Sequence, residues 1–292
     1  MSKCILCGSN KFENLGKVKN GEYDKIFLEK FSFLKCRKCS FVFMSPPPSE
    51  EDFNIIYSDK NYSQWEKLGE KTKEGSSYLN FKYYSNIIKK YKNHCRVLDC
   101  GCGTGIFMDA MKEEDFDCFG VETSKIPLLI LKNKYPGKIF EKRIEDSEIK
   151  NGFFQVVTMF DFIEHVQSPR AVLRKTHTVL SDDGFLFIIT PNIKSLSAIL
   201  FGTRHNDYNL EHIGLFDKNN ISTLLKECGF RVLKNIPAEK IVNLEFAEKV
   251  FKKHTNILFY PINFLNKLLP KKITRFPIKL HFGGMFIVAK KA

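Results

Sequence analysis

Residues 97–105 have the composition that most directly suggests chemistry, because an apolar run ends in Asp99 and then breaks into glycines at alternate positions. These glycines are Gly101, Gly103 and Gly105. Glycine permits a tight turn without side chains, so a ligand can approach the backbone and the first amides of the helix that we expect from Ile106. The segment therefore predicts a site for a bound cofactor.

A second carboxylate, Glu122, follows the next apolar stretch, at residues 116–121. An ionised carboxylate offers only acceptors and can take both hydroxyls of a ribose, so the pattern indicates a nucleoside-containing cofactor. A dinucleotide loop would need a third glycine at the position of Ile106. The spacing Gly-x-Gly-x-Gly therefore favours a different nucleoside cofactor.

Preceded by Asp99, this glycine loop resembles motif I of the class I S-adenosylmethionine-dependent methyltransferases. Residues 154–160 resemble the fourth strand of that family, and residues 161–166 resemble the Glu-His-Val signature of its branch acting on small molecules and lipids. A helix from Pro169, where the missing N–H costs nothing, follows in the family's order. The resemblance covers roughly residues 78–292.

The resemblance implies an α/β fold with a Rossmann-like, seven-stranded sheet and helices on both faces, mostly parallel with the last strand antiparallel. We expect a turn at Asp183-Gly184 before a fifth strand at residues 185–190. A helix over residues 217–228, ended by Gly229, leads to the sixth strand, and residues 284–290 form the seventh.

The resemblance also implies S-adenosylmethionine as the cofactor and assigns its contacts. Asp99 and the glycines Gly101, Gly103 and Gly105 would surround the methionine and ribose portions, with the backbone of Cys102 touching the cofactor. Glu122 would bind the ribose hydroxyls, and Asp146 matches the family's adenine-contacting acidic position. Asp161 lies either near the sulfonium or at a helix cap.

Two Cys-x-x-Cys pairs near the start of the chain supply candidate metal ligands: Cys4, Cys7, Cys36 and Cys39. Each pair places two thiolates at a spacing that suits a tetrahedral zinc site, and four thiolates leave no open position, so the expected Zn2+ is structural. Reduced surface cysteines are the alternative. The pairs resemble zinc knuckles that precede the methyltransferase domain in some enzymes modifying sugars and cell-surface glycans, where an aromatic strand and prolines follow, as at residues 41–48.

Composition shifts divide the chain into three parts. These are a zinc-knuckle module at 1–44, a linker at 45–77 and a methyltransferase domain at 78–292, whose segment 231–282 is basic and aromatic-rich and lies between the last two strands. Within the module we expect a hairpin with a strand over residues 27–34. In the linker, Tyr57, Tyr62 and Trp65 either line a substrate cleft or pin the linker to the main domain.

A cofactor with an activated methyl group leaves the protein to bind, align and deprotonate the acceptor. Histidine has the unperturbed pKa nearest neutrality, which suits a general base for a hydroxyl. His165 follows the fourth strand at the ligand-binding edge of an α/β sheet, so it is the first candidate for base or substrate contact. Alternatively, His165 holds the loop in place or contacts the cofactor. Glu164 would orient this imidazole or bind a divalent cation, and His205 and His212, after the fifth strand, are further candidates.

Charge is concentrated near the end of the chain, which has a formal net charge of +13. Residues 231–292 contain 13 Lys/Arg and 3 Asp/Glu, and so hold +10 of it. Residues 250–272 mix aromatic residues, leucines and lysines, which favours peripheral contact with an anionic membrane or a packed helical insertion with a solvated basic face. The polar start and the lack of a long apolar stretch predict a cytoplasmic protein, free or peripheral at the inner membrane surface.

The expected reaction is O-methylation of a sugar, nucleotide-sugar or lipid-linked glycan intermediate, an acceptor that is either anionic or lipid-linked. The alternatives are an RNA or other nucleic-acid methyltransferase, which basic charge would suit, and a non-catalytic zinc-binding scaffold. Enzymes that methylate exocyclic base nitrogens commonly carry Asn/Asp-Pro-Pro-aromatic after the fourth strand, whereas this chain has residues 161–164 (DFIE) there. The sequence leaves open whether oxygen, nitrogen or carbon is methylated.

Overall fold

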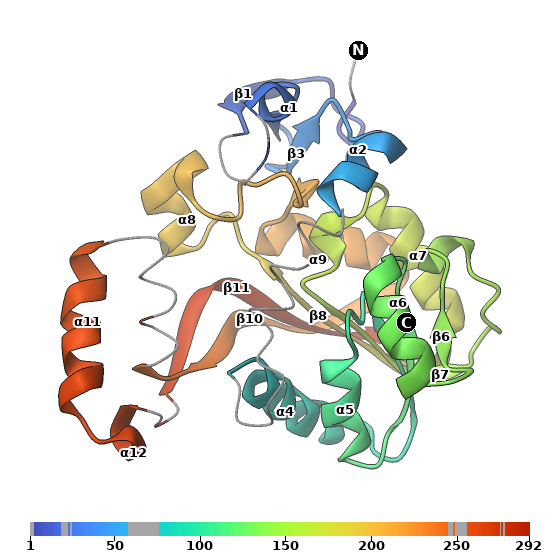
Figure 1. Cartoon of the computed structure of the whole chain (residues 1–292). Helices are drawn as coiled ribbons and strands as arrows, with labels where there is room; N and C mark the ends of the chain where they lie inside the picture. The colour runs from blue at the N-terminus through green and yellow to red at the C-terminus, as the bar shows by residue number, and fades with distance from the viewer. Residues whose placement is uncertain are drawn as a thin grey trace.

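The computed structural model describes residues 3–18, 23, 25–57, 76–244, 248, 256–274, 276 and 278–292. Two sheets organise this part of the chain: a large sheet flanked by helices and a small sheet that carries the N-terminal residues (Figure 1). The linker residues Tyr62 and Trp65 lie outside the described residues.

The large sheet has seven strands in the order β10-β11-β8-β7-β4-β5-β6. Their bounds are β4 Arg96–Cys100, β5 Asp117–Val121, β6 Ile139–Phe140, β7 Phe154–Phe160, β8 Leu180–Pro191, β10 Phe230–Val242 and β11 Ile278–Lys291. Neighbours from β8 to β6 pair in parallel, whereas β11 runs antiparallel to both β8 and β10. The expected fold, including its antiparallel last strand, is confirmed.

Helices cover both faces of this sheet, and successive side chains of β4 point to opposite sides and pack against them. Val97 packs in one buried cluster with residues of α4 (Ser76–Lys89) and α5 (Ile106–Lys112). Leu98 packs in the other with residues of α7 (Pro169–Val179) and α9 (Lys218–Glu227). Helix α6 (Lys125–Lys134) joins the first cluster through Leu131. The packed helices thereby fix the positions of the strand ends, from which the loops of the candidate site begin.

Two strands are longer than the sequence predicts. The assigned β8 begins at Leu180, and its pairing with β7 shifts register before Phe185, so the expected turn at Asp183-Gly184 lies inside an irregular strand. β11 begins at Ile278, because residues 278–281 pair with residues 239–242 of β10. The segment between the last two strands is therefore residues 243–277, shorter than the expected 231–282.

The small sheet joins three N-terminal strands to a short strand from the second half of the chain, in the order β1-β2-β3-β9. Its strands are β1 Phe12–Lys17, β2 Ser32–Cys36, β3 Val42–Ser45 and β9 Gly214–Leu215. Residue Phe27 lies in α1 (Lys25–Glu29), so the expected strand over 27–34 starts only at Ser32. Phe41 packs on Phe216 with ring centroids 4.9 Å apart. The N-terminal part is therefore docked on the large domain through a shared sheet.

Four further helices matter for the site and its surroundings: α2 Glu50–Ile56, α8 Leu196–Phe201, α11 Asn256–Leu268 and α12 Lys271–Thr274. Helix α2 lies within the linker and starts with a capping box at Ser49 and Asp52. Among the described residues, no helix combines the length and hydrophobicity needed to cross a bilayer.

Candidate active site

The glycine loop follows β4 and opens a pocket at the carboxyl edge of the large sheet. All three glycines have positive φ, with Gly101 at 74° and Gly105 at 78°, a conformation that other residues adopt with strain. A Cβ on Gly101 would lie 2.6 Å from Cδ2 of Phe162. The pocket holds about 200 Å³ and is lined by Phe81, Asp99, Gly101, Cys102, Gly103, Thr104, Ile106, Phe107 and Phe160.

Asp99 lies at the base of this pocket and is only 5% exposed. Its Oδ1 accepts a hydrogen bond from Oγ1 of Thr158 at 2.7 Å. Burial, together with the nearby charge of Glu122, raises the pKa of the Asp99 carboxyl to about 7. A ligand that brings a positive charge would favour the ionised carboxylate.

Glu122 is held beside the loop by three backbone N–H groups. Gly103 donates to its Oε2 at 3.0 Å, while Thr123 and Ser124 donate to its Oε1 at 2.8 and 2.7 Å. A carboxylate has about four acceptor positions, so about one remains for a ligand hydroxyl. The arrangement suits a ribose lying along the loop.

The other cofactor candidates occupy different surroundings. The backbone of Cys102 reaches the pocket, but its Sγ is buried against Gly120, where an added Cβ would lie 2.4 Å from the sulfur. Asp161 is exposed at a φ of 49°, and Phe162, not Asp161, caps the short helix that follows. Asp146 ion-pairs with Arg143 at 3.3 Å and is absent from the pocket lining. Its adenine contact remains a prediction.

Three polar side chains converge after β7: Glu164, His165 and His212. Nδ1 of His165 lies 2.8 Å from the carbonyl oxygen of Glu211, and Nδ1 of His212 lies 2.8 Å from that of Asp207. Because a carbonyl can only accept, both rings must be protonated at Nδ1. Each Nε2 therefore keeps its lone pair, and the two rings lie edge to face with centroids 4.9 Å apart.

Glu164 is fully buried beneath these rings. Its Oε2 accepts from Oγ1 of Thr190 at 3.0 Å, whereas Oε1 has no hydrogen-bond partner among the described residues. One ligand atom from each of Glu164, His165 and His212 lies within 4.8 Å of the others, so the group could hold a metal ion. Such an unpaired buried oxygen is costly unless it is protonated or meets a ligand.

The protein surroundings favour the neutral forms of this cluster. Desolvation, with a contribution from His212, lowers the pKa of His165 to about 3. Burial raises the pKa of the Glu164 carboxyl well above its usual range. The His165 ring is therefore unprotonated at neutral pH and can accept a hydrogen bond from an acceptor hydroxyl.

The N-terminal part of the chain reaches this cluster directly. Oη of Tyr57 lies 3.1 Å from Nδ1 of His165. Met44 in β3 donates its N–H to the carbonyl of Ile213 at 2.9 Å, and Ile213 donates to the carbonyl of Glu164 at 2.8 Å. A backbone ladder thus joins the small sheet to the catalytic candidates. The sequence showed Tyr57 only as one aromatic residue of the linker, because its partner lies 108 positions away.

His205 does not join the cluster. Its Nε2 lies 3.1 Å from Oγ of Ser197 in α8, and its Nδ1 lies 3.1 Å from Oδ2 of Asp207. Both ring nitrogens are therefore engaged within the loop, and the residue is best placed to shape that loop.

The four N-terminal cysteines come together as the sequence predicts for a metal site. Sγ of Cys4 lies 3.6 Å from that of Cys39, and Sγ of Cys7 lies 3.5 Å from that of Cys36. All four sulfurs lie within 4.8 Å of one another. Zn–S bonds of about 2.3 Å in a tetrahedron place the sulfurs about 3.8 Å apart, so the cluster fits the ion.

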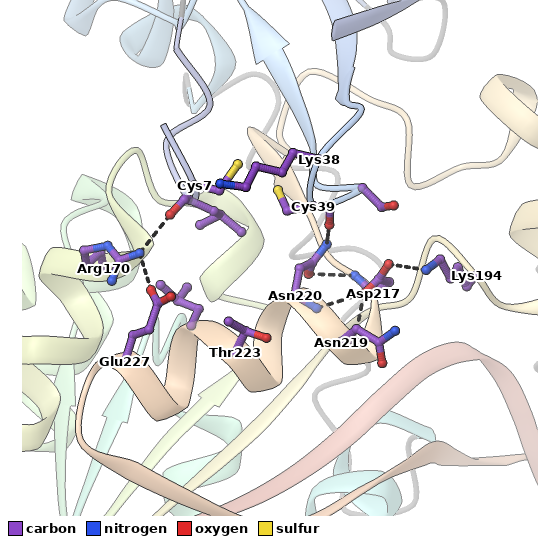
Figure 2. A pocket seen from close by; sticks show the side chains of 13 residues that line it. Cys7, Lys38, Cys39, Arg170, Lys194, Asp217, Asn219, Asn220, Thr223 and Glu227 are labelled. Atoms are coloured by element: carbon purple, nitrogen blue, oxygen red, sulfur yellow. Dashed lines mark hydrogen bonds and ion pairs between the residues drawn. The ribbon is translucent and has the colours of Figure 1, made fainter. Parts of the chain in front are cut away.

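A second pocket, of about 310 Å³, lies between this cysteine cluster and helices α7 and α9 (Figure 2). Arg170 donates to the carbonyl of Leu6 at 2.8 Å and to Glu227 at 2.6 Å. Lys194 pairs with Asp217 at 2.6 Å. Its charged side chains are thus largely engaged with each other, and they tie the cysteine module to the large domain.

The fold and the glycine-loop site define a class I S-adenosylmethionine-dependent methyltransferase. A family model described as a methyltransferase domain matches residues 64–235, and the chain belongs to that family. The methyltransferase family expected from the sequence is thereby confirmed, and it supports S-adenosylmethionine as the cofactor.

Curated relatives match part of the chain. The ubiquinone biosynthesis O-methyltransferase of Pseudomonas aeruginosa is 31% identical over 122 residues, covering 40% of this chain and 52% of its own. Its counterpart from Vibrio parahaemolyticus is 31% identical over 112 residues, covering 36% of this chain and 47% of its own. The chain therefore spans about half the length of these relatives.

Solved structures share the fold. A SAM-dependent methyltransferase from Archaeoglobus fulgidus has a TM-score of 0.56 at 22% identity, covering 80% of this chain and 100% of its own. The 1,6-didemethyltoxoflavin-N1-methyltransferase of Burkholderia thailandensis, solved with S-adenosylhomocysteine, has a TM-score of 0.53 at 13% identity, covering 95% and 99%. These likenesses concern the fold alone.

Proposed function

We propose that the protein O-methylates a hydroxyl of a sugar, nucleotide-sugar or lipid-linked glycan intermediate. The observation that carries this proposal is the neutral His165, which has an unprotonated Nε2 and clusters with Glu164 and His212 beyond the carboxyl end of β7. The O-methyltransferase names of the curated relatives support an oxygen acceptor. The cysteine module supports the glycan class, since the sequence resembles zinc knuckles of enzymes that modify sugars.

S-adenosylmethionine supplies a methyl group on a sulfonium, which is transferred by in-line displacement. Glu122 would hold the ribose, and Asp99 would face the positively charged methionine portion. Nε2 of His165 would accept the hydrogen bond of the acceptor hydroxyl and orient its oxygen for attack, and the hydroxyl proton would leave to solvent. Glu164, neutral and fully buried nearby, would help to hold the imidazole in place.

The test is a methyl-transfer screen with radiolabelled cofactor against nucleotide-sugars, lipid-linked glycans and RNA. The proposal expects label in a sugar hydroxyl with wild-type protein and strongly reduced transfer with His165→Ala at unchanged cofactor affinity. Label in RNA alone would overturn it in favour of a nucleic-acid methyltransferase. Cofactor binding without transfer to any of these acceptors would also count against the proposed acceptor class.

We also propose that Cys4, Cys7, Cys36 and Cys39 hold a structural zinc ion. The ion would fix the small sheet, and the small sheet reaches the catalytic candidates through Met44 and Ile213. Elemental analysis should find about one zinc per chain, and Cys39→Ser should lose it together with thermal stability. Cys228→Ser is the control, because this buried cysteine lies outside the cluster. Equal metal content in Cys39→Ser and wild type would contradict the assignment.

A further inference from the structure

Helix α11 turns its apolar side to solvent. The exposed residues are Tyr260, Phe264, Leu265 and Leu268, of which Phe264 is 65% and Leu268 67% exposed. Their spacing places them along one side of the helix. On the other side, Nδ2 of Asn266 donates to the carbonyl of Leu244 at 3.0 Å. Asn266, together with the half-buried Ile262 one turn earlier, therefore anchors the helix to the protein, while larger apolar residues face solvent.

Helix α8 shows the same inversion. Its outward residues are Leu196, Ile199, Leu200 and Phe201, which are 84%, 67%, 74% and 57% exposed, while Ala198 is buried. A Cβ on Gly283 would lie 2.9 Å from Oγ of Ser197, so α8 rests on β11. Figure 1 shows α8 and α11 on the same side of the molecule, with α11 beside the ends of β10 and β11 and α8 nearer to the small sheet.

Residues 276–280, which follow α12 and open β11, add further exposed apolar side chains. Phe276, Ile278 and Leu280 are 66%, 47% and 44% exposed. We call the exposed side chains of α8, α11 and residues 276–280 the apolar face. Single exposed apolar residues are common, but a gathering of this size on a few elements marks an interaction surface.

The positive charge around the apolar face favours an anionic partner. Lys267 of α11, Lys271 of the adjoining α12 and Lys279 of β11 are exposed, and Lys279 also lies 3.9 Å from a carboxylate oxygen of Glu239. Residues 231–292 hold 13 Lys/Arg against 3 Asp/Glu. A second copy of the chain would set these positive charges against one another, whereas an anionic surface would pair with them.

We propose that the apolar face inserts into the interfacial region of an anionic lipid bilayer, with the lysines at the headgroups. Outward aromatic and aliphatic side chains flanked by lysines are the composition that interfacial helices use. Ser197 of α8 hydrogen-bonds His205, on the loop that leads to His212, at 3.1 Å. The bilayer would therefore lie beside the loop that carries a catalytic candidate. The proposal holds for any acceptor and does not depend on the proposed reaction.

The experiment is co-sedimentation of the full chain with vesicles of phosphatidylcholine, alone or with about 30% phosphatidylglycerol. Wild-type protein should pellet with the anionic vesicles and do so less at high salt. Ile199→Glu/Leu200→Glu and Phe264→Glu/Leu268→Glu should each weaken partitioning by about tenfold or more. The control is Leu129→Glu, because this leucine of α6 is 69% exposed but lies outside the apolar face.

Unfolding midpoints and S-adenosylmethionine affinity show whether each variant is folded, since none of the altered residues lines the cofactor pocket. The proposal is overturned if wild-type protein does not bind anionic vesicles. It is also overturned if Leu129→Glu loses as much vesicle binding as the folded variants of the apolar face. Equal binding to neutral vesicles would overturn the anionic partner. A monomer–dimer change in light scattering without any change in vesicle binding would assign the face to self-association instead.

Discussion

Asp99→Asn tests the electrostatics of the cofactor pocket. The carboxyl is 5% exposed and accepts one hydrogen bond from Thr158 at 2.7 Å. Burial and the charge of Glu122 raise its pKa from 3.8 to about 7. Asparagine keeps an acceptor oxygen for Thr158 but cannot ionise. The variant should therefore not lose folding stability as pH rises in the way that wild type does.

The magnitude follows from proton linkage. Between pH 3.8 and about 7, the native protein binds more protons at Asp99 than the unfolded chain does, so ionisation there lowers wild-type stability as pH rises. Each pH unit within this window costs about 1.4 kcal/mol. Between about pH 5.5 and about pH 8, wild type loses stability only until the pH reaches the native pKa of about 7. This interval of about 1.5 pH units lowers the unfolding free energy by about 2 kcal/mol.

The assay is urea unfolding of ligand-free protein at these two pH values. The unfolding free energy of Asp99→Asn minus that of wild type should rise by about 2 kcal/mol between them. Asp115→Asn is the control, because this carboxylate is exposed, and its difference should change little. A difference for Asp99→Asn that is independent of pH would refute the argument. The variant should also bind S-adenosylmethionine more weakly, having lost the negative charge.

Three further substitutions test the site. Gly103→Asp should weaken S-adenosylmethionine binding by about 100-fold or more in titration calorimetry, because it strains a φ of 52° and adds a charge beside Glu122. Gly137→Asp, at a φ of 72° with open space around it, is the matched control, and equal losses would point to folding rather than the site. His165→Asn should lower kcat by about 100-fold or more while cofactor affinity is kept. Because the pKa of His165 is about 3, the pH profile of wild-type kcat should show no histidine titration near pH 6.5. A titration there would contradict the role of a neutral His165. Tyr57→Phe should lower kcat by less than about tenfold, since the Glu211 carbonyl still orients the ring; a loss as large as that of His165→Asn would make Tyr57 a direct participant.

Features that depend on neighbouring residues were predicted correctly from the sequence. The glycine loop has the backbone that alternating glycines suggest, α5 begins at Ile106 and α7 begins at Pro169. Strong local signals suffice there because a turn, a cap or a missing N–H acts within a few residues. The four cysteines also meet, as their two Cys-x-x-Cys pairs predict.

Features set by distant contacts did not follow. β9 joins the N-terminal sheet by pairing with β3, and Tyr57 meets His165, because packing brings remote segments together without a local signature. The strand expected over 27–34 was partly wrong, since residues 25–29 form a helix. The outward orientation of α8 was equally hidden, because an apolar helical stripe normally predicts burial, whereas membrane contact was one of two expectations for residues 250–272, which include α11.

The central claim is that the glycine loop and Glu122 bind S-adenosylmethionine for methyl transfer. Calorimetric titration of zinc-loaded protein with S-adenosylmethionine, S-adenosylhomocysteine and NADH tests it most directly. The account predicts micromolar binding of the first two ligands and none of NADH. A folded sample that binds neither methionine-derived ligand would contradict the site assignment and favour a non-catalytic scaffold.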